Sequence, residues 1–278
     1  MISDYPRIAQ KLYCEPAMIT AEAHQILCDT FNAHVSGIDP SQAAIDQYMV
    51  EPPELAVQDG VAIGNVEGVI SRKISQLERG CGAVGVEDVI GLVEQAMSDD
   101  EVKALVLTFD SPGGSGMGTP EVASYIRQAS KRKPIISYAD GLMASAAYYM
   151  ASGSTAIYAS ESAMVGSIGT YIAILDQTRA VEMQGVKVEL FKAGRLKAAG
   201  YPGTELSDEQ REYMQGLVDE LNDQFTAFVN ATRGGIDSET MQGQVFTANR
   251  AKTLGLIDSI ATFDQVLMDA KTLAARRG

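Results

Sequence analysis

One serine stands where a predicted strand passes into a helix rich in small residues, in the run from Asp140 to Tyr149. At such a junction the hydroxyl of Ser145 is held at a helix N-terminus beside free backbone N–H groups, which suits a nucleophile. The alternative is that Ser145 simply caps its own helix. As a nucleophile it would also need a neighbouring base to remove its proton.

The usual base is missing from the sequence around this serine. Only His24 and His34 occur, so an imidazole could act here only if the N-terminal segment folds back over the site. A neutral lysine can replace it if burial lowers the lysine pKa from about 10.4 by roughly 3 units. The run from Lys192 to Lys197, after a predicted strand ending at Phe191, supplies basic residues, and a solvated turn is the alternative there.

A glycine-rich run, Asp-Ser-Pro-Gly-Gly-Ser-Gly, covers Asp110 to Gly116 directly after an apolar strand. Glycines let backbone N–H groups approach a ligand closely, either a phosphate or a developing oxyanion, and a plain tight turn is the alternative. The spacing argues against a nucleotide, because a dinucleotide fingerprint needs a glycine where Thr119 stands and no phosphate-loop motif is present.

Short apolar runs alternate with helical periods along the chain from residue 60. We predict strands at 61–66, 102–109, 134–139, 155–159, 170–175 and 186–191, with helices at 89–97, 120–131, from 144, and 177–184. A long helix follows from Ser207, capped with Gln210, and its apolar stripe must face the core or a neighbouring subunit. A last helix spans 264–275. This alternation predicts an α/β fold with a largely buried sheet.

The first fifty residues have a different character from the rest. They contain both histidines and two of the three cysteines, and we predict helices near 20–32 and 40–49 before the helix-breaking run Glu-Pro-Pro-Glu at 51–54. We therefore expect an N-terminal arm over residues 1–55 and one large domain over 56–278.

Composition narrows the class of partner. The 278 residues carry a formal charge of −14 with a pI near 4.6, which argues against nucleic acid and anionic membranes and favours peptides, proteins or small molecules. Three cysteines without ligand-like spacing argue against a disulfide framework or a zinc site. The sequence has no apolar run of about 18–20 residues and no signal-peptide pattern. We expect a soluble cytoplasmic protein that is neither secreted nor membrane-spanning.

Five runs, in order, resemble the signal peptide peptidase A (S49) family of serine-lysine proteases. They are Asp-Ser-Pro-Gly-Gly at 110–114, Met-Ala-Ser-Ala-Ala-Tyr-Tyr at 143–149, Val-Gly-Ser-Ile-Gly at 165–169, Gly-Val-Lys-Val-Glu at 185–189 and Lys-Ala-Gly-Arg-Leu-Lys at 192–197. The similarity covers about residues 60–265. It implies a Clp protease/crotonase-like spiral of strand–strand–helix units.

The resemblance also implies a role for each matching residue. Ser145 corresponds to the nucleophile and Lys197 to the general base, while Ser167 corresponds to the hydroxyl that orients the lysine amine. The backbone N–H groups of Gly114 and Ala146 correspond to the oxyanion hole. The family often has Gly-Gly after the nucleophile, whereas this chain has Ala-Ala, which narrows the adjacent pocket.

The same resemblance implies that Gly113 contacts substrate and that the reaction needs no metal and no cofactor.

The N-terminal runs Pro-Arg-Ile-Ala at 6–9 and Glu-Pro-Ala-Met-Ile at 15–19 are similar to the start of phage prohead maturation proteases of this family. This implies a homo-oligomer, with sites near subunit interfaces, that cleaves scaffold, portal or other capsid-assembly proteins in the host cytoplasm or the assembling prohead. Two alternatives stay open: a crotonase-type acyl-CoA enzyme and a catalytically silent capsid-assembly scaffold.

Overall fold

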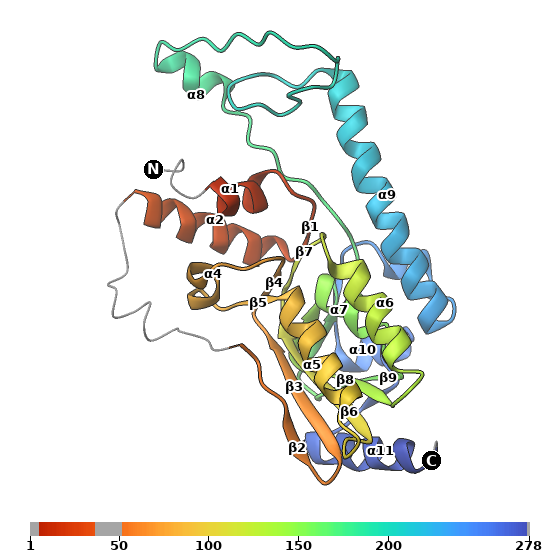
Figure 1. Cartoon of the computed structure of the whole chain (residues 1–278). Coiled ribbons are helices and arrows are strands. Elements are labelled where there is room, and N and C mark those ends of the chain that lie inside the picture. Colours follow the sequence, from red (N-terminus) through yellow and green to blue (C-terminus); the bar gives the residue numbers. More distant parts are fainter. Residues whose placement is uncertain (1–5, 37–51, 277–278) are drawn as a thin grey trace.

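The computed structural model describes residues 6–36 and 52–276, in which an N-terminal arm packs against an α/β body (Figure 1). The helix predicted at 40–49, and residue 51 of the predicted boundary, lie outside these described residues. The boundary at 55 itself stays a prediction.

The larger sheet has parallel strands at its centre, in the order β3, β6, β8. Its strands are β2 (Ala56–Gln58), β3 (Val61–Glu67), β6 (Ala104–Ser111), β8 (Ile135–Ala144), β9 (Ala156–Ala159), β10 (Met164–Gly166), β11 (Val245–Thr247) and β12 (Ser259–Ile260). Because side chains alternate along a strand, Leu105 and Leu107 of β6 enter one apolar cluster and Val106 enters another on the opposite face. The predicted buried sheet is therefore confirmed.

Helices cover both faces of this sheet (Figure 1). On one face lie α5 (Val86–Ser98), α6 (Thr119–Ala129) and α7 (Ala146–Ala151), and on the other lies α11 (Phe263–Ala275). Short elements near the C-terminus are a 3-10 turn (Ser238–Thr240) and α10 (Ala248–Thr253). The α/β class predicted from the alternating pattern is confirmed.

The smaller sheet joins the arm to the body. Its strand order is β1 (Ala17–Ile19), β7 (Gly113–Ser115), β4 (Val69–Ser71) and β5 (Ala83–Gly85), and α4 (Gln76–Gly80) lies between β4 and β5 in sequence. The arm consists of α1 (Pro6–Tyr13), β1 and α2 (Ala21–Val35). In sequence, β6, β7 and α6 form one strand–strand–helix unit, as does β3 with β4 before α5. This is the repeated unit that the predicted fold implies.

One segment of the body projects from the rest. Between β10 and the long helix α9 (Asp208–Arg233), the chain runs through α8 (Thr178–Met183), which lies at the top of Figure 1, far from the larger sheet. The strands predicted at 170–175 and 186–191 are wrong. A strand needs a paired neighbour, and within these two ranges the described part of the chain provides one to Tyr171 alone, which forms an isolated β-bridge with Ala17.

Helix α9 leads from this projection back to the body (Figure 1). Its apolar stripe divides into two parts, because Phe225 and Val229 are buried in the core whereas Met214 and Leu217 are only half-buried. Phe225 stacks on Tyr149 of α7, with 4.4 Å between ring centroids. We refer below to residues 169–206 as the projection.

None of the helices in the described part of the chain combines the length and the apolar character needed to cross a membrane.

Candidate active site

Ser145 holds a strained position between β8 and α7. It is the N-cap of α7 with φ of 53° and ψ of −114°, a conformation that costs a non-glycine residue energy and persists only where its surroundings enforce it. Its N–H donates to the Gly166 carbonyl over 2.8 Å. The side chain makes no capping hydrogen bond, so the interpretation of Ser145 as a cap of its own helix is wrong, and the hydroxyl is not used by the helix.

Ser167 stands beside Ser145. The parallel strands β8 and β10 pair Ala144 with Gly166, so each serine is the next residue after that pair, at the same edge of the sheet. Ser167 also has a positive φ, 52°, and its N–H donates to the Gln244 carbonyl over 2.6 Å. Two neighbouring strands thus present two serines from backbones held in similar strained turns.

Two glycines of β7 complete the wall next to Ser145. A Cβ atom on Gly113, whose φ is 97°, would lie 2.9 Å from the Ser145 Cβ, and one on Gly114 would lie 1.7 Å from the Ile70 carbonyl oxygen. Both positions therefore require glycine. The Gly113 N–H donates to Ser111 Oγ over 3.2 Å.

The predicted oxyanion donor Ala146 is the first residue of α7. The N–H of a residue at this position has no acceptor within its own helix, so it is free for another group. Ser145, Ser167, Gly113 and Ala146 are thus brought together by the ends of β8 and β10, the start of α7 and β7.

Lys197 is not part of this group within one chain. It is exposed, in a turn of the projection where its N–H donates to the Gly194 carbonyl over 3.1 Å. The neighbouring Arg195 pairs with Glu209 at the start of α9 over 2.9 Å, and Figure 1 places the chain between α8 and α9 away from α7. No hydrogen bond joins Ser145 and Lys197 among the described residues.

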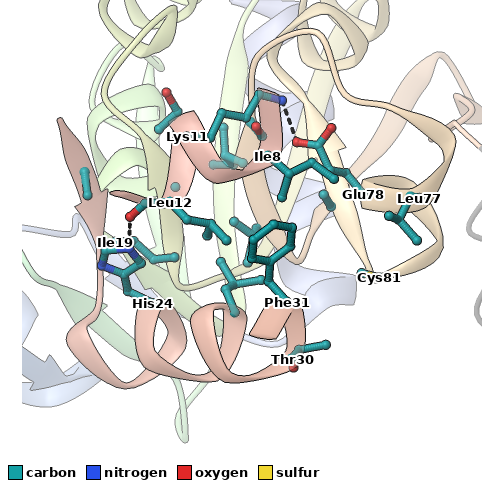
Figure 2. Close-up of a pocket in the computed structure, with 18 of the residues that line it drawn as sticks. Ile8, Lys11, Leu12, Ile19, His24, Thr30, Phe31, Leu77, Glu78 and Cys81 are labelled. Atoms are coloured by element: carbon teal, nitrogen blue, oxygen red, sulfur yellow. Dashed lines mark hydrogen bonds and ion pairs between the residues drawn. The ribbon is translucent and has the colours of Figure 1, made fainter. Parts of the chain in front are cut away.

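His24 does fold back toward the body, but both of its ring nitrogens are engaged. Nε2 lies 2.8 Å from the Leu12 carbonyl oxygen, which only accepts, so Nε2 carries the proton (Figure 2). Nδ1 lies 2.8 Å from the Tyr171 hydroxyl. Burial, together with the nearby Cys28, raises the pKa of Tyr171 to about 12, so this phenol stays protonated and can donate to Nδ1. His24 is therefore a structural link rather than a free base.

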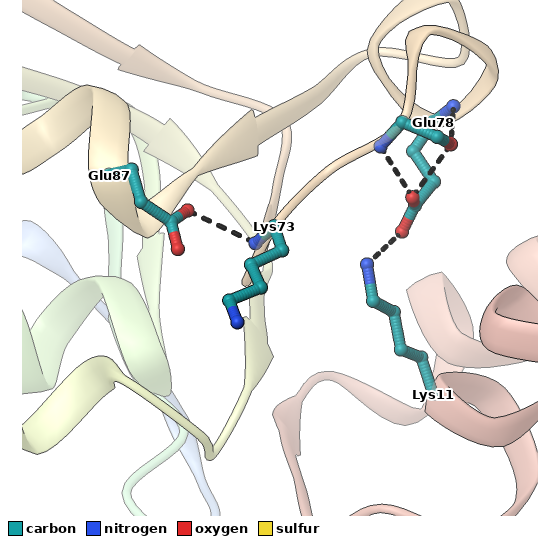
Figure 3. Close-up of polar contacts among 5 residues, drawn as sticks. Lys11, Lys73, Glu78 and Glu87 are labelled. Atoms are coloured by element: carbon teal, nitrogen blue, oxygen red, sulfur yellow. Dashed lines mark hydrogen bonds and ion pairs between the residues drawn. The ribbon is translucent and has the colours of Figure 1, made fainter.

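A second polar link ties the arm to the body. Lys11 of α1 pairs with Glu78 of α4 over 2.5 Å, and Glu78 also accepts hydrogen bonds from the N–H and the hydroxyl of Ser75 in a capping box (Figure 3). Nearby, the Lys73 N–H donates to Glu87 over 3.0 Å, as Figure 3 also shows. The pair formed by Lys11 and Glu78 holds α1 over the segment between β4 and β5.

Sequence reasoning assigned no individual role to Met18 or Tyr171, which the structure places in β1 and beside it. Met18 pairs with Gly114 across β1 and β7, and Tyr171 pairs with Ala17. A strand of three residues shows no usable periodicity, and the one signal near it was the resemblance of residues 15–19. In the described part of the chain, no three His, Cys, Asp or Glu side chains cluster as a metal site would require.

Comparison with known proteins decides the family. The model of peptidase family S49 matches residues 127–277, more than half of the chain. The chain belongs to peptidase family S49. The match includes Ser145, Ser167 and Lys197.

Several relatives are similar over a large part of this S49 chain. A protein of Methanocaldococcus jannaschii is 30% identical over 188 residues, 66% of this chain and 60% of its own length. The capsid assembly protease C of Escherichia phage lambda is 29% identical over 80% of this chain and 51% of its own length. The head-tail preconnector protein GP5 of Enterobacteria phage P21 is 26% identical over 78% and 45%. The chain thus spans about half the length of these relatives.

Solved structures also align with this S49 chain. An enoyl-CoA hydratase from Shewanella pealeana aligns with a TM-score of 0.47 at 14% identity, over 84% of this chain and 77% of its own. A ClpP1 variant from Listeria monocytogenes aligns with a TM-score of 0.48 at 12% identity, over 81% and 97%.

Proposed function

We propose that this S49 member is a serine endopeptidase whose nucleophile is Ser145. The observation that carries the proposal is the hydroxyl of Ser145, which its helix does not use and which a strained backbone holds beside Ser167 and the glycines of β7. Strained residues held in this way cluster at active sites, where the surrounding fold over-determines their position.

The base in this proposal is Lys197 of a neighbouring protomer. Within one chain Lys197 is exposed on the projection, which also carries several exposed apolar side chains: Leu175, Met183, Val186, Leu190, Phe191 and Tyr201. Phe191, six residues before Lys197, is 95% exposed. Apolar side chains gathered on an otherwise unsupported segment favour a protein contact. In a homo-oligomer, the projection of one protomer would reach the next protomer and bring Lys197 close to the Ser145 of that protomer.

The chemistry follows from these positions. Neutral Lys197 removes the Ser145 proton, and the Ser145 oxygen forms a bond to the carbonyl carbon of the peptide. The N–H groups of Gly114 and Ala146 stabilise the oxyanion that develops. Protonated Lys197 then gives its proton to the leaving amine as the C–N bond breaks, and Ser167 holds the lysine amine in place. Water hydrolyses the acyl-enzyme in the same way, with Lys197 again acting as base, and frees Ser145.

The substrates in this proposal are capsid-assembly proteins, such as scaffold and portal proteins, in an infected bacterial cytoplasm or assembling prohead. Two relatives carry names from this process, a capsid assembly protease and a head-tail preconnector protein. The net charge of −14 is compatible with protein substrates and argues against nucleic acid.

The test follows cleavage of co-expressed head proteins by Ser145→Ala and Lys197→Ala. Each substitution should lower the rate by up to about 10⁶-fold, because loss of a nucleophile or its base removes the whole dyad reaction. Lys192→Ala, in the same exposed run, is the matched control and should keep full activity. Unchanged processing by either dyad variant would contradict the proposal. Inactivity of the unmodified chain toward every head protein would favour the scaffold alternative.

A further inference from the structure

The strand β1 lies between two segments of the body. On one side it pairs antiparallel with β7, where the Thr20 N–H donates to the Pro112 carbonyl and the Gly116 N–H donates to the Pro16 carbonyl, both over 3.0 Å. On the other side Ala17 exchanges two hydrogen bonds with Tyr171, over 2.9 and 3.1 Å. The arm therefore fills, as a strand, a slot between β7 and the start of the projection.

The register places this strand at the site itself. Met18 stands opposite Gly114, midway between the two bonded pairs formed by residues 16 and 116 and by residues 20 and 112. Because bonded pairs recur at every second residue of an antiparallel ladder, Met18 and Gly114 are such a pair. The Gly114 N–H that is proposed for the oxyanion hole thus faces the Met18 carbonyl.

The strand also covers the nucleophile. A Cβ atom on Gly113 would lie 2.2 Å from the Met18 carbonyl oxygen and 2.9 Å from the Ser145 Cβ, so both border the same glycine. Ser145 is 1% exposed and Met18 is 0% exposed. A peptide cannot reach Ser145 while these residues are in place.

We propose that residues 16–19 occupy the groove in which an extended peptide substrate binds, and that the substrate strand must displace them. This inference rests on the proposed peptidase function and adds a regulation of the same site. Once β1 leaves, the groove offers the free edge of strand β7 on one side and the backbone N–H and carbonyl of Tyr171 on the other. A free strand edge of this kind binds peptides by β-augmentation. The buried side chain of Met18 indicates that the position opposite Gly114 accepts an apolar residue.

The contact between arm and body is loosely packed, which makes displacement feasible. A cavity of about 160 Å³ lies along this contact (Figure 2). Apolar side chains from both parts line it, among them Ile8, Leu12, Phe31, Ile70 and Leu77. Atoms that line a void lose dispersion contacts on one side, so the arm is held less firmly than a fully packed element would be.

The experiment measures peptide binding in the full-length Ser145→Ala chain, so that no cleavage interferes. The probe is a capped, labelled peptide of residues 15–20, Glu-Pro-Ala-Met-Ile-Thr, followed by fluorescence anisotropy. Adding Ala17→Pro removes the N–H that donates to Tyr171 and should tighten binding about tenfold or more, because less of the groove is occupied by the chain's own strand. A probe with aspartate in place of methionine should not bind, since its charge would enter an apolar slot.

Ala21→Pro is the matched control. It makes the same substitution at the first residue of α2, where proline is tolerated, and leaves the bonds of β1 intact, so its affinity should equal that of the parent.

Hydrogen exchange on the Ser145→Ala chain without arm substitutions provides the second measurement. Saturating probe should raise deuterium uptake in residues 16–20. Equal affinities for the Ala17→Pro and Ala21→Pro chains, or unchanged uptake, would overturn the proposal. Because both readouts are independent of turnover, their failure is distinguishable from failure of the peptidase function, which the activity of Ser145→Ala tests.

Discussion

The surroundings of Ser145 and those of Lys197 differ in nearly every physical respect. Ser145 is buried, strained and fixed by backbone hydrogen bonds between paired strands. Lys197 is exposed in a turn of the projection, where neighbouring apolar side chains such as Leu190 and Phe191 are exposed as well. Under the proposed mechanism, one chain positions the nucleophile Ser145 by itself, whereas the base Lys197 needs the surface of a second protomer.

We expect the largest effect from a substitution beside Ser145. Gly114→Ala would put a methyl group 1.7 Å from the Ile70 carbonyl oxygen, so β7 must move away from β4. We expect peptidase activity to fall about 10³-fold, comparable to the loss of an oxyanion donor. The control is Gly91→Ala in α5, where a Cβ meets nothing within 4 Å; it should keep activity and gain about 0.5–1 kcal/mol of stability.

Substitution of one phenylalanine in the core and one on the projection compares how tightly the two regions are packed. Phe225 is fully buried and stacks on Tyr149, so Phe225→Ala should lower the free energy of unfolding by about 3–5 kcal/mol. Phe191→Ala should change the stability of the monomer by less than about 0.5 kcal/mol, since its ring is exposed there. Urea denaturation at a concentration where the chain is monomeric measures both. A large loss from Phe191→Ala would show that the projection is packed within its own chain.

The pH profile tests the nature of the base. A lysine base acts only when it is neutral, so kcat/KM should rise about tenfold per pH unit over the range in which the base is mostly protonated. The rise follows because deprotonation of the ammonium creates the active form. Initial rates with a peptide substrate between pH 6 and 9 measure it, and a flat profile over that range would contradict a lysine base.

The surroundings of Ser145 could be predicted from the sequence because the motifs that form them are local. A strand, a glycine run and a small-residue helix follow one another around Gly113 and Ser145, so their closeness in the fold could be predicted, and their chemistry stays a prediction. The structure adds that the Ser145 side chain makes no capping hydrogen bond to its own helix. The sequence alone could not decide this point.

The remaining features depend on pairing between distant segments. Residues 186–191 have the composition of a strand but form none, because no segment among residues 6–36 and 52–276 pairs with them. Residues 17–19 form a strand despite their short length because β7 and Tyr171 supply partners on both sides. For the same reason the position of Lys197 relative to Ser145 cannot follow from their spacing of about 50 residues.

Mixing two inactive variants tests the shared site most directly. Ser145→Ala keeps Lys197 and Lys197→Ala keeps Ser145, so an oligomer that contains both has some interfaces with an intact pair. With equal amounts and random assembly, we expect up to about a quarter of the unmodified activity, because each interface must draw the correct variant on both sides. Native mass spectrometry verifies that mixed oligomers form. Mixed oligomers without activity above either variant alone would contradict a dyad shared between protomers.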